Sequence, residues 1–342
     1  MKKITLGFSL LAAVVFFTGC NKKTNVAPEQ DMEFESTKNV TFGNALITEI
    51  DIIASYAGEN YNNSSPFFTR LSTNINDSII VKRDTVTKKL TVTYTGSVTC
   101  RDNKKRNGTI VIDYSSSSVT YGSKFYRDPG YIAKVTLNNY WVDGWYVDDV
   151  VPFVITNNIP FGYNLASTSL NWTMDGYFSI KPQVAADSVN KIVWQGKLTK
   201  TLTNTQQVLS SKLTPINWVT YTVSGTPIAA AKLAYTGTVT GVTSRVISYK
   251  FVIDNSKPEQ ALVRDFSCST EKIAGVVTTP SVSAIYSEWH PFISGVATFT
   301  SFGPGTVEPR VIDYGSGANP GPCDNAGTVT IKGITYNIDF KK

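Results

Sequence analysis

The fold class is decided by the stretch Thr328-Val-Thr-Ile-Lys-Gly-Ile-Thr-Tyr-Asn-Ile-Asp-Phe340. Apolar and polar residues alternate on both sides of Lys332-Gly333, and this period of two is typical of a strand with one buried face. A two-residue connection that ends in Gly is typical of a hairpin, because Gly readily adopts a positive φ. The stretch therefore predicts two antiparallel strands.

The same alternation recurs through most of the preceding chain. It predicts further short strands at 90–94, 109–114, 133–140, 145–155, 169–174, 191–198, 218–223, 232–240, 245–253 and 296–302. β-branched and aromatic residues are abundant and only 17% of residues are charged, which also favours sheet over helix. We therefore predict an all-β protein, built as an antiparallel β-sandwich or as an extended β-sheet.

One short helix is expected before the strands. Its apolar residues recur at the 3.6-residue period of a helix face, at Leu46, Ile47, Ile50, Ile53, Ala54 and Ala57. Asn44 is placed to cap its start and Gly58 to end it. The Ile content leaves a strand open as the alternative.

The beginning of the chain has the pattern of a secretion signal. Lys2 and Lys3 precede an apolar run, Ile4 to Phe17, which is shorter than the roughly 20 residues of a membrane-spanning helix. Phe17-Thr18-Gly19-Cys20 resembles the bacterial lipobox, in which a cysteine becomes lipidated, although Phe17 stands where Leu, Val or Ile is usual. We therefore expect residues 1–19 to be removed and Cys20 to carry diacylglyceryl and palmitate chains, which form a firm membrane anchor.

Composition divides the remaining chain into regions. Residues 20–38 are polar and are interpreted as a tether, 39–62 as helix and linker, and 63–225 and 226–342 as two β-rich regions. Asn21, in place of Asp, favours the outer membrane. The periplasmic and the surface side both remain open.

Charge and histidine content restrict the classes of function. The net charge of +6 includes the two lysines of the signal, so the mature chain is nearly neutral and nucleic acid is not an expected partner. The one histidine is His290, in Ser287-Glu-Trp-His-Pro291, where neighbours on a strand would point to opposite faces. A His-based metal site or catalytic triad would depend on this residue alone, so we expect no cofactor, no metal and no enzyme activity.

Three segments resemble a group of uncharacterised secreted proteins and lipoproteins of Bacteroidota. These segments are 100–112, 192–200 and 312–331, the last containing Cys323-Asp-Asn-Ala-Gly-Thr-Val-Thr-Ile. The resemblance implies an all-β envelope protein and implies no activity. The first and last segments also resemble each other, as strand, loop with Cys, and Gly-Thr opening a strand. A duplicated unit and convergence on hairpin chemistry both explain this likeness.

Cys100, Cys268 and Cys323 are the cysteines beside the anchor, and they allow three single disulfides in an oxidising compartment. The resemblance implies a cysteine at the positions of Cys268 and Cys323, both in the last third of the chain. We therefore expect a Cys268–Cys323 disulfide. Cys100 is then interpreted as a buried bystander.

A cluster of aromatic and acidic residues is the strongest candidate for binding. It consists of Trp141, Asp143, Trp145, Asp148 and Asp149. Such rings and acids can bind a glycan, and two acids about 5.5 Å or about 6.5–9.5 Å apart could hydrolyse one. The alternative is a strand–turn–strand with Trp in the core and Asp in the turn.

Two further patterns are weaker. Arg101, Asp102, Lys104, Lys105 and Arg106 form a basic loop, interpreted either as an anion-binding site or as a solvated hairpin tip. Ser78, Thr85 and Ser188 each follow Asp and precede an aliphatic residue, as in O-glycosylation sites of Bacteroidota, which would place them on the surface.

These observations favour a lipid-anchored cell-envelope protein that acts as a non-enzymatic structural or interaction module. Its partners would be the membrane, through Cys20, and a glycan or another envelope protein. A glycan-binding or adhesion lipoprotein is the alternative, and a carboxylate-based glycoside hydrolase is a third.

Overall fold

The computed structural model describes most of the chain beyond the proposed tether. The described residues are 34–59, 78–100, 104–118, 126–161, 169–182, 191–203, 221–223, 226–228, 232–265, 292–302, 309–315 and 326–340. They belong to one compact unit, Phe34–Lys342. Cys20, Ser188, Cys268, His290 and Cys323 lie outside the described residues, so the predictions on them stay predictions.

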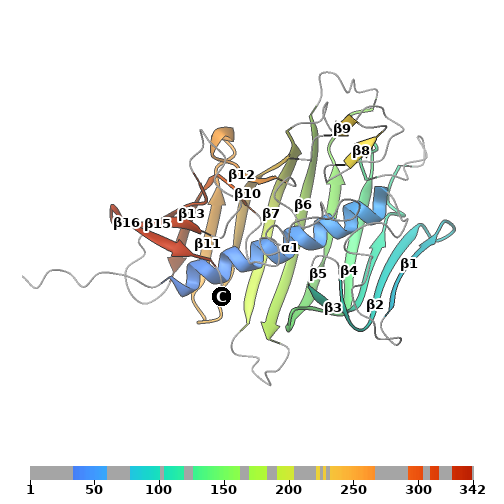
Figure 1. The fold of residues 1–342 in the computed structure, drawn as a ribbon, viewed down its shortest axis with the longest axis horizontal. Helices are drawn as coiled ribbons and strands as arrows, with labels where there is room; N and C mark the ends of the chain where they lie inside the picture. Colours follow the sequence, from blue (N-terminus) through green and yellow to red (C-terminus); the bar gives the residue numbers. More distant parts are fainter. Residues whose placement is uncertain are drawn as a thin grey trace, which may run out of the picture. The chain divides into compact units, whose positions relative to one another are not determined.

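One antiparallel sheet of 14 strands forms the body. Figure 1 shows its strands side by side. Its strands are β1 (Ser78–Asp84), β2 (Lys89–Thr99), β3 (Lys105–Asp113), β4 (Ile132–Val142), β5 (Trp145–Asn157), β6 (Leu170–Pro182), β7 (Ile192–Leu202), β10 (Lys232–Val242), β11 (Ser248–Ile253), β12 (Leu262–Asp265), β13 (Val296–Phe302), β14 (Arg310–Asp313), β15 (Ala326–Ile331) and β16 (Ile334–Asp339). A separate pair is formed by β8 (Tyr221–Val223) and β9 (Thr226–Ile228).

Strand order follows the chain from β1 to β7 and continues through β10, β11 and β13 to β16, with β12 paired to β10. The two ends of this order, β1 and β16, are not paired with each other, so the sheet is open. The all-β prediction is confirmed, and of its two architectures the extended sheet is the one observed. β7 pairs with β10 over ten residues, so the sheet runs across the boundary expected near 225.

The terminal hairpin forms as expected. Ile331 is paired with Ile334, and both connecting residues have positive φ, 50° for Lys332 and 79° for Gly333. The two segments that resemble each other lie near opposite ends of the sheet, where β2 pairs with β3 and β14 pairs with β15.

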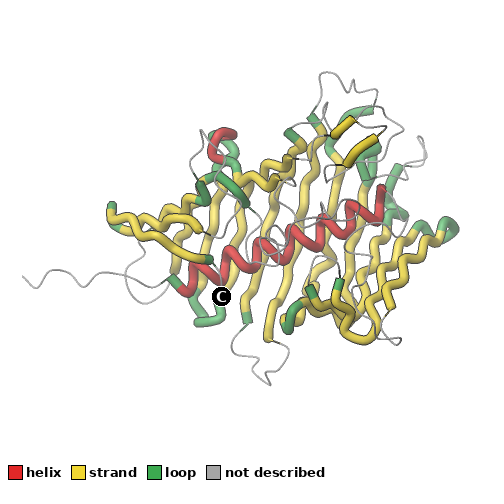
Figure 2. The backbone as a smooth tube through the Cα atoms, viewed as in Figure 1, coloured by secondary structure: helices red, strands yellow, loops and turns green. Residues whose placement is uncertain are grey.

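In the described part of the chain, one α-helix, α1 (Glu35–Glu59), crosses a face of the sheet, and a short 3-10 helix, η1 (Pro258–Gln260), precedes β12. Figure 2 shows α1 in red across the yellow strands. Its 25 residues correspond to about 37 Å, the width of about eight strands. The helix is therefore longer than expected and begins at Glu35, inside the segment interpreted as tether.

Nearly every side chain of α1 is buried, so the helix is a core element. Asn44 lies in its middle and does not cap its start: its Oδ1 accepts a hydrogen bond of 2.8 Å from Trp194 Nε1 on β7. Phe42 packs on Trp145 with the ring centroids 4.7 Å apart. The face of the sheet that contacts α1 is called the inner face below, and the opposite face is called the outer face.

Alternation along the strands explains which residues form the core. On β6, for example, Trp172, Met174, Phe178 and Ile180 are fully buried on the inner face. The residues between them are polar or partly exposed, which is usual for an antiparallel sheet that faces water on one side. The outer face is therefore rich in Thr, and one row of cross-strand neighbours is Thr156, Thr173, Thr199 and Thr236.

Candidate functional site

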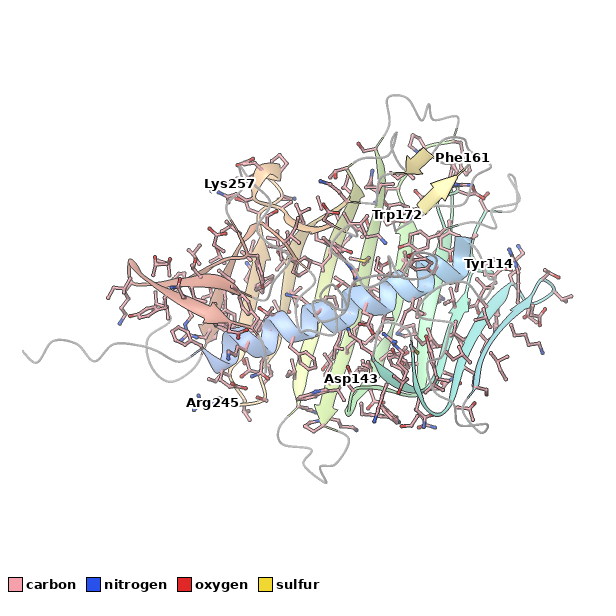
Figure 3. All side chains as sticks on the ribbon, in the orientation of Figure 1. Tyr114, Asp143, Phe161, Trp172, Arg245 and Lys257 are labelled. Atoms are coloured by element: carbon pink, nitrogen blue, oxygen red, sulfur yellow. The ribbon has the colours of Figure 1, made fainter. Side chains whose placement is uncertain are left out.

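The predicted aromatic and acidic cluster forms the hairpin between β4 and β5. Asp143 and Gly144 make its two-residue connection, with φ of 48° and 80°. Positive φ at both residues is the tight turn that Asp-Gly favours, because it matches the twist of the two strands. Figure 3 labels Asp143 at the lower edge of the sheet, where this hairpin turns.

Register places the two tryptophans of the cluster on opposite faces. Val142 is paired with Trp145, and both belong to the inner face, where Trp145 contacts Phe42. Trp141 is paired with Tyr146, and both belong to the outer face. The structure therefore does not bring the two tryptophans of the predicted cluster together on one face, because neighbouring register positions of a strand point in opposite directions.

A β-bulge turns Trp141 outward. Leu137 and Tyr140 are both buried, although regular alternation from Leu137 would bury Asn139 and Trp141 instead. Asn139 is the extra residue, and its φ of 49° is left-handed, a conformation that Asn tolerates better than most residues. Bulges commonly redirect a side chain in this way.

The neighbouring strand fits closely against this bulge. Gly108 on β3 has φ of 89°, and a Cβ added there would lie 2.1 Å from the carbonyl oxygen of Asn139. The pairing of β3 with β4 shifts at this point, between Asn107 and Thr109. The outward position of Trp141 therefore depends on a glycine more than 30 residues away in sequence.

Two of the three acids of the cluster bind backbone N–H groups. Asp143 accepts a hydrogen bond of 2.8 Å from the backbone N–H of Lys105, and its own N–H donates to the Lys105 carbonyl at 2.9 Å. Asp149 accepts a hydrogen bond of 2.9 Å from the backbone N–H of Leu137, across a break in the pairing of β4 and β5. Burial raises the pKa of both carboxyls. Asp143 and Asp149 thus stabilise backbone, as the strand–turn–strand alternative predicts.

Asp148 remains on the outer face with Tyr146. Its Oδ2 lies 3.3 Å from Lys181 Nζ on β6, and the same ammonium lies 4.9 Å from the centroid of the Tyr146 ring. The Tyr146 hydroxyl donates to Asn139 Oδ1 at 3.3 Å. Partial burial and the neighbouring Asp148 charge raise the pKa of Tyr146.

The outer-face group is therefore Trp141, Tyr146, Asp148, Lys181 and Asn139, here called the Trp141 platform. Tyr146, Lys181 and Asn139 were not among the predicted site residues. Tyr146 could have been found from the sequence, because an Asp143-Gly144 turn places it directly opposite Trp141. Lys181 comes from β6 and has no local signal.

Two groups of buried charges lie on the inner face, between the sheet and α1. In the first, Glu49 of α1 accepts a hydrogen bond from Lys104. It accepts another from Arg106, which is fully buried and whose Nη2 lies 2.6 Å from Glu49 Oε1. Burial alone would raise the pKa of Glu49, but these two cations lower it to about 2. The interpretation of this basic segment as a solvated tip is wrong for Lys104 and Arg106, which turn inward, while Lys105 is exposed.

In the second group, Asp51 of α1 accepts hydrogen bonds of 2.6 Å from both Lys200 Nζ and the Tyr126 hydroxyl. Lys200 Nζ also lies 4.9 Å from the ring of Trp172, which Figure 3 labels beside α1. Burial lowers the pKa of Lys200, whereas burial and Asp51 raise the pKa of Tyr126. All these groups are fully buried, so their evident role is to attach α1 to β7.

The remaining predictions have mixed outcomes. The Cys100 thiol is buried, as expected, and contacts the Val98 carbonyl oxygen at 3.9 Å. Ser78 begins β1 and is partly exposed, and Thr85 is exposed in the next turn. Asp84 accepts hydrogen bonds from the N–H groups of Val86 and Thr87, so this acid has a structural role beside its glycosylation motif.

The described residues offer neither a metal-ion site nor a membrane-spanning helix. They contain no group of three or more His, Cys, Asp or Glu residues placed to hold a metal ion. They also contain no helix with the length and apolar character needed to span a membrane.

Comparison of the chain with protein-family models, with curated proteins and with solved structures found no match. The resemblance to the Bacteroidota group stays a prediction, and function is inferred from the geometry of the chain itself.

Proposed function

We propose that this protein is a lipid-anchored component of the cell envelope, attached to the outer membrane through Cys20, and that its body is a non-enzymatic interaction module. The outer face of the sheet is the working surface. The single observation that carries the proposal is that the sheet is one-sided: α1 occupies the inner face, and the outer face is partly exposed from β2 to β15.

The ionisable clusters support this assignment. Glu49 with Lys104 and Arg106, and Asp51 with Lys200, are buried ion pairs that join α1 to the sheet. Removing one partner of such a pair strongly destabilises a protein, because it leaves an uncompensated buried charge. Because these groups are buried, they do not form a surface for a partner, and we assign that role to the outer face.

Two measurements test the proposal in cells that produce the protein. Labelling with a palmitate analogue should be lost in the Cys20→Ala variant, and label that persisted would reject the anchor. A photo-reactive residue at Thr199, in the middle of the outer face, should give discrete cross-linked products. The control carries the same photo-reactive residue in place of Lys332, in the exposed β15–β16 turn. Identical products from both positions would reject the outer face as the working surface.

Glycan binding is the second candidate function, and one observation favours it. Trp141 and Tyr146 are directly opposed on the outer face, beside the Asp148 carboxylate and the Lys181 ammonium. Glycoside hydrolysis has less support. Asp143 and Asp149 bind backbone N–H groups, and Asp148 forms an ion pair with Lys181.

A further inference from the structure

We infer that the outer face of β4, β5 and β6 holds a binding track for an extended, uncharged polysaccharide. Trp141 and Tyr146 form one end of the track and Tyr177 forms the other. The inference rests on the proposed interaction module and deepens it, because it assigns a class of ligand to one part of the outer face.

Register places the three rings on one face. Trp141 of β4 is paired with Tyr146 of β5, which is paired with Lys181 of β6. Tyr177 lies four residues from Lys181 on β6, on the same face, because Phe178 and Ile180 are buried on the other. Four residues of a strand correspond to about 13 Å, so the rings span more than a single sugar.

Polar groups lie between the rings. Asp148 is paired with Ser179, midway between the Tyr146–Lys181 pair and Tyr177. A carboxylate, a hydroxyl and the nearby ammonium of Lys181 offer both acceptors and donors to sugar hydroxyls. Beside them, Val150 and Val151 are about half exposed, at 53% and 50%. Aromatic faces with hydroxyl-binding groups between them match a pyranose chain, whose rings have apolar faces and polar edges.

The charges of the track favour an uncharged chain. Asp148 and Lys181 neutralise each other at 3.3 Å. Beyond Tyr177 on the same face, Asp175 lies opposite Lys197 of β7 in the strand register, and these two side chains carry charges of opposite sign. Neither a polyanion nor a polycation would meet a surface of complementary charge along this path.

The backbone around Trp141 is consistent with a binding role. Asn139 has a left-handed conformation, and Gly108 must lack a side chain, in order to turn an indole away from the core. An outward Trp forgoes the stabilisation that full burial of its ring would give. Trp141 is therefore partly buried on the outer face. Backbone irregularities that redirect a side chain are over-represented beside functional sites.

Affinity electrophoresis of the full-length lipoprotein in detergent tests the inference. The gels contain a mixed-linkage β-glucan, a galactomannan or a dextran as neutral polymers, and alginate as the acidic polymer. We expect at least one neutral polymer to retard the protein and alginate to leave it unretarded. Trp141→Ala and Tyr177→Ala should each weaken the affinity by roughly thirtyfold, the effect of removing a hot-spot side chain.

Two control variants accompany these substitutions. Phe302→Ala removes a ring on β13 that is 50% exposed and is paired with Ser248 of β11. In the strand order, β7, β10 and β11 separate β13 from β6. This variant should bind like the original protein. Tyr177→Phe keeps the ring and should keep most of the affinity. Circular dichroism of each variant confirms that the sheet is intact.

Three outcomes would overturn the track: no retardation by any of the neutral polymers, retardation by alginate alone, or equal binding by the Trp141→Ala, Tyr177→Ala and Phe302→Ala variants. If neutral polymers fail while Thr199 still gives specific cross-links, the track is rejected and the interaction module stands. If the Cys20 label is absent while the polymers bind, the lipid anchor of the proposed function is rejected and the track stands.

Discussion

At the scale of single residues, the least expected feature is the charge buried beneath α1. Lys200 occupies an inner-face position of β7 whose neighbours on that face, Leu198 and Leu202, are apolar. The strict alternation of β7 therefore predicts a buried position for a charged residue. Its partner, Asp51, lies 149 residues away in sequence, and only the packing of α1 on β7 brings them together.

The low pKa of Glu49 predicts that the folded protein loses stability in acid. This pKa is about 2 in the folded protein against an ordinary value of 4.5. A lowered pKa stabilises the folded state fully above the unfolded value, and this stability is lost as the pH falls from about 4.5 towards 2. The loss amounts to roughly 3 kcal/mol. Urea unfolding between about pH 6 and pH 2 measures it.

Matched variants isolate this contribution. Glu49→Gln should remove this part of the pH dependence and should also destabilise the protein at neutral pH by about 3–5 kcal/mol, because Arg106 then lacks its buried counter-ion. Glu259→Gln, at an exposed position, is the control. An unchanged pH dependence in Glu49→Gln would show that Glu49 is not the titrating group.

At the scale of elements, α1 and the β4 bulge differ most from expectation. The apolar face from Leu46 to Ala57 was recognisable, but α1 begins at Glu35. The first turns of α1 could not be recognised from the period of apolar residues, because Ser36, Thr37 and Asn39 are polar and yet buried. The period of a helix face predicts a surface helix, whereas α1 is a core helix buried on nearly all sides.

Because β3 fits closely against the bulge, we expect two glycine substitutions to lower the free energy of unfolding by different amounts. Gly144→Ala forces a side chain into a left-handed conformation, φ 80°, but into open space, and should cost about 1–2 kcal/mol. Gly108→Ala has a similar φ and in addition meets the carbonyl oxygen of Asn139, so its cost should exceed about 3 kcal/mol. Denaturant unfolding of both variants makes the comparison. Equal losses would contradict the close fit of β3 against the bulge.

At the scale of the whole molecule, the continuous sheet predicts cooperative unfolding. The ten paired residues of β7 and β10 join the regions on either side of residue 225, and α1 lies across the same sheet. Elements that share one sheet and one core are expected to unfold together. Pulsed hydrogen exchange along a urea gradient should therefore give the same midpoint for β6 and β11. Two separate midpoints would mean that residues 63–225 and 226–342 unfold as independent domains.

Sequence alone determined the class of this fold and the ends of many strands. Alternation over a few residues, as at Leu90-Thr-Val-Thr-Tyr94, and turn residues such as Lys332-Gly333 act locally, so they can be recognised without knowing any distant partner. The proposed signal and anchor at Cys20 rest on the same kind of local pattern. Asp143-Gly144 likewise contained enough information to pair Trp141 with Tyr146.

Only the tertiary structure decided which face each side chain of the candidate site occupies. One extra residue in a strand, Asn139, moves the residues after it to the opposite face, and that bulge is accommodated by Gly108 of another strand. The platform also needs Lys181 from β6, as Glu49 needs Arg106 from β3. Contacts between strands and between helix and sheet join residues far apart in the chain, and no local period records them.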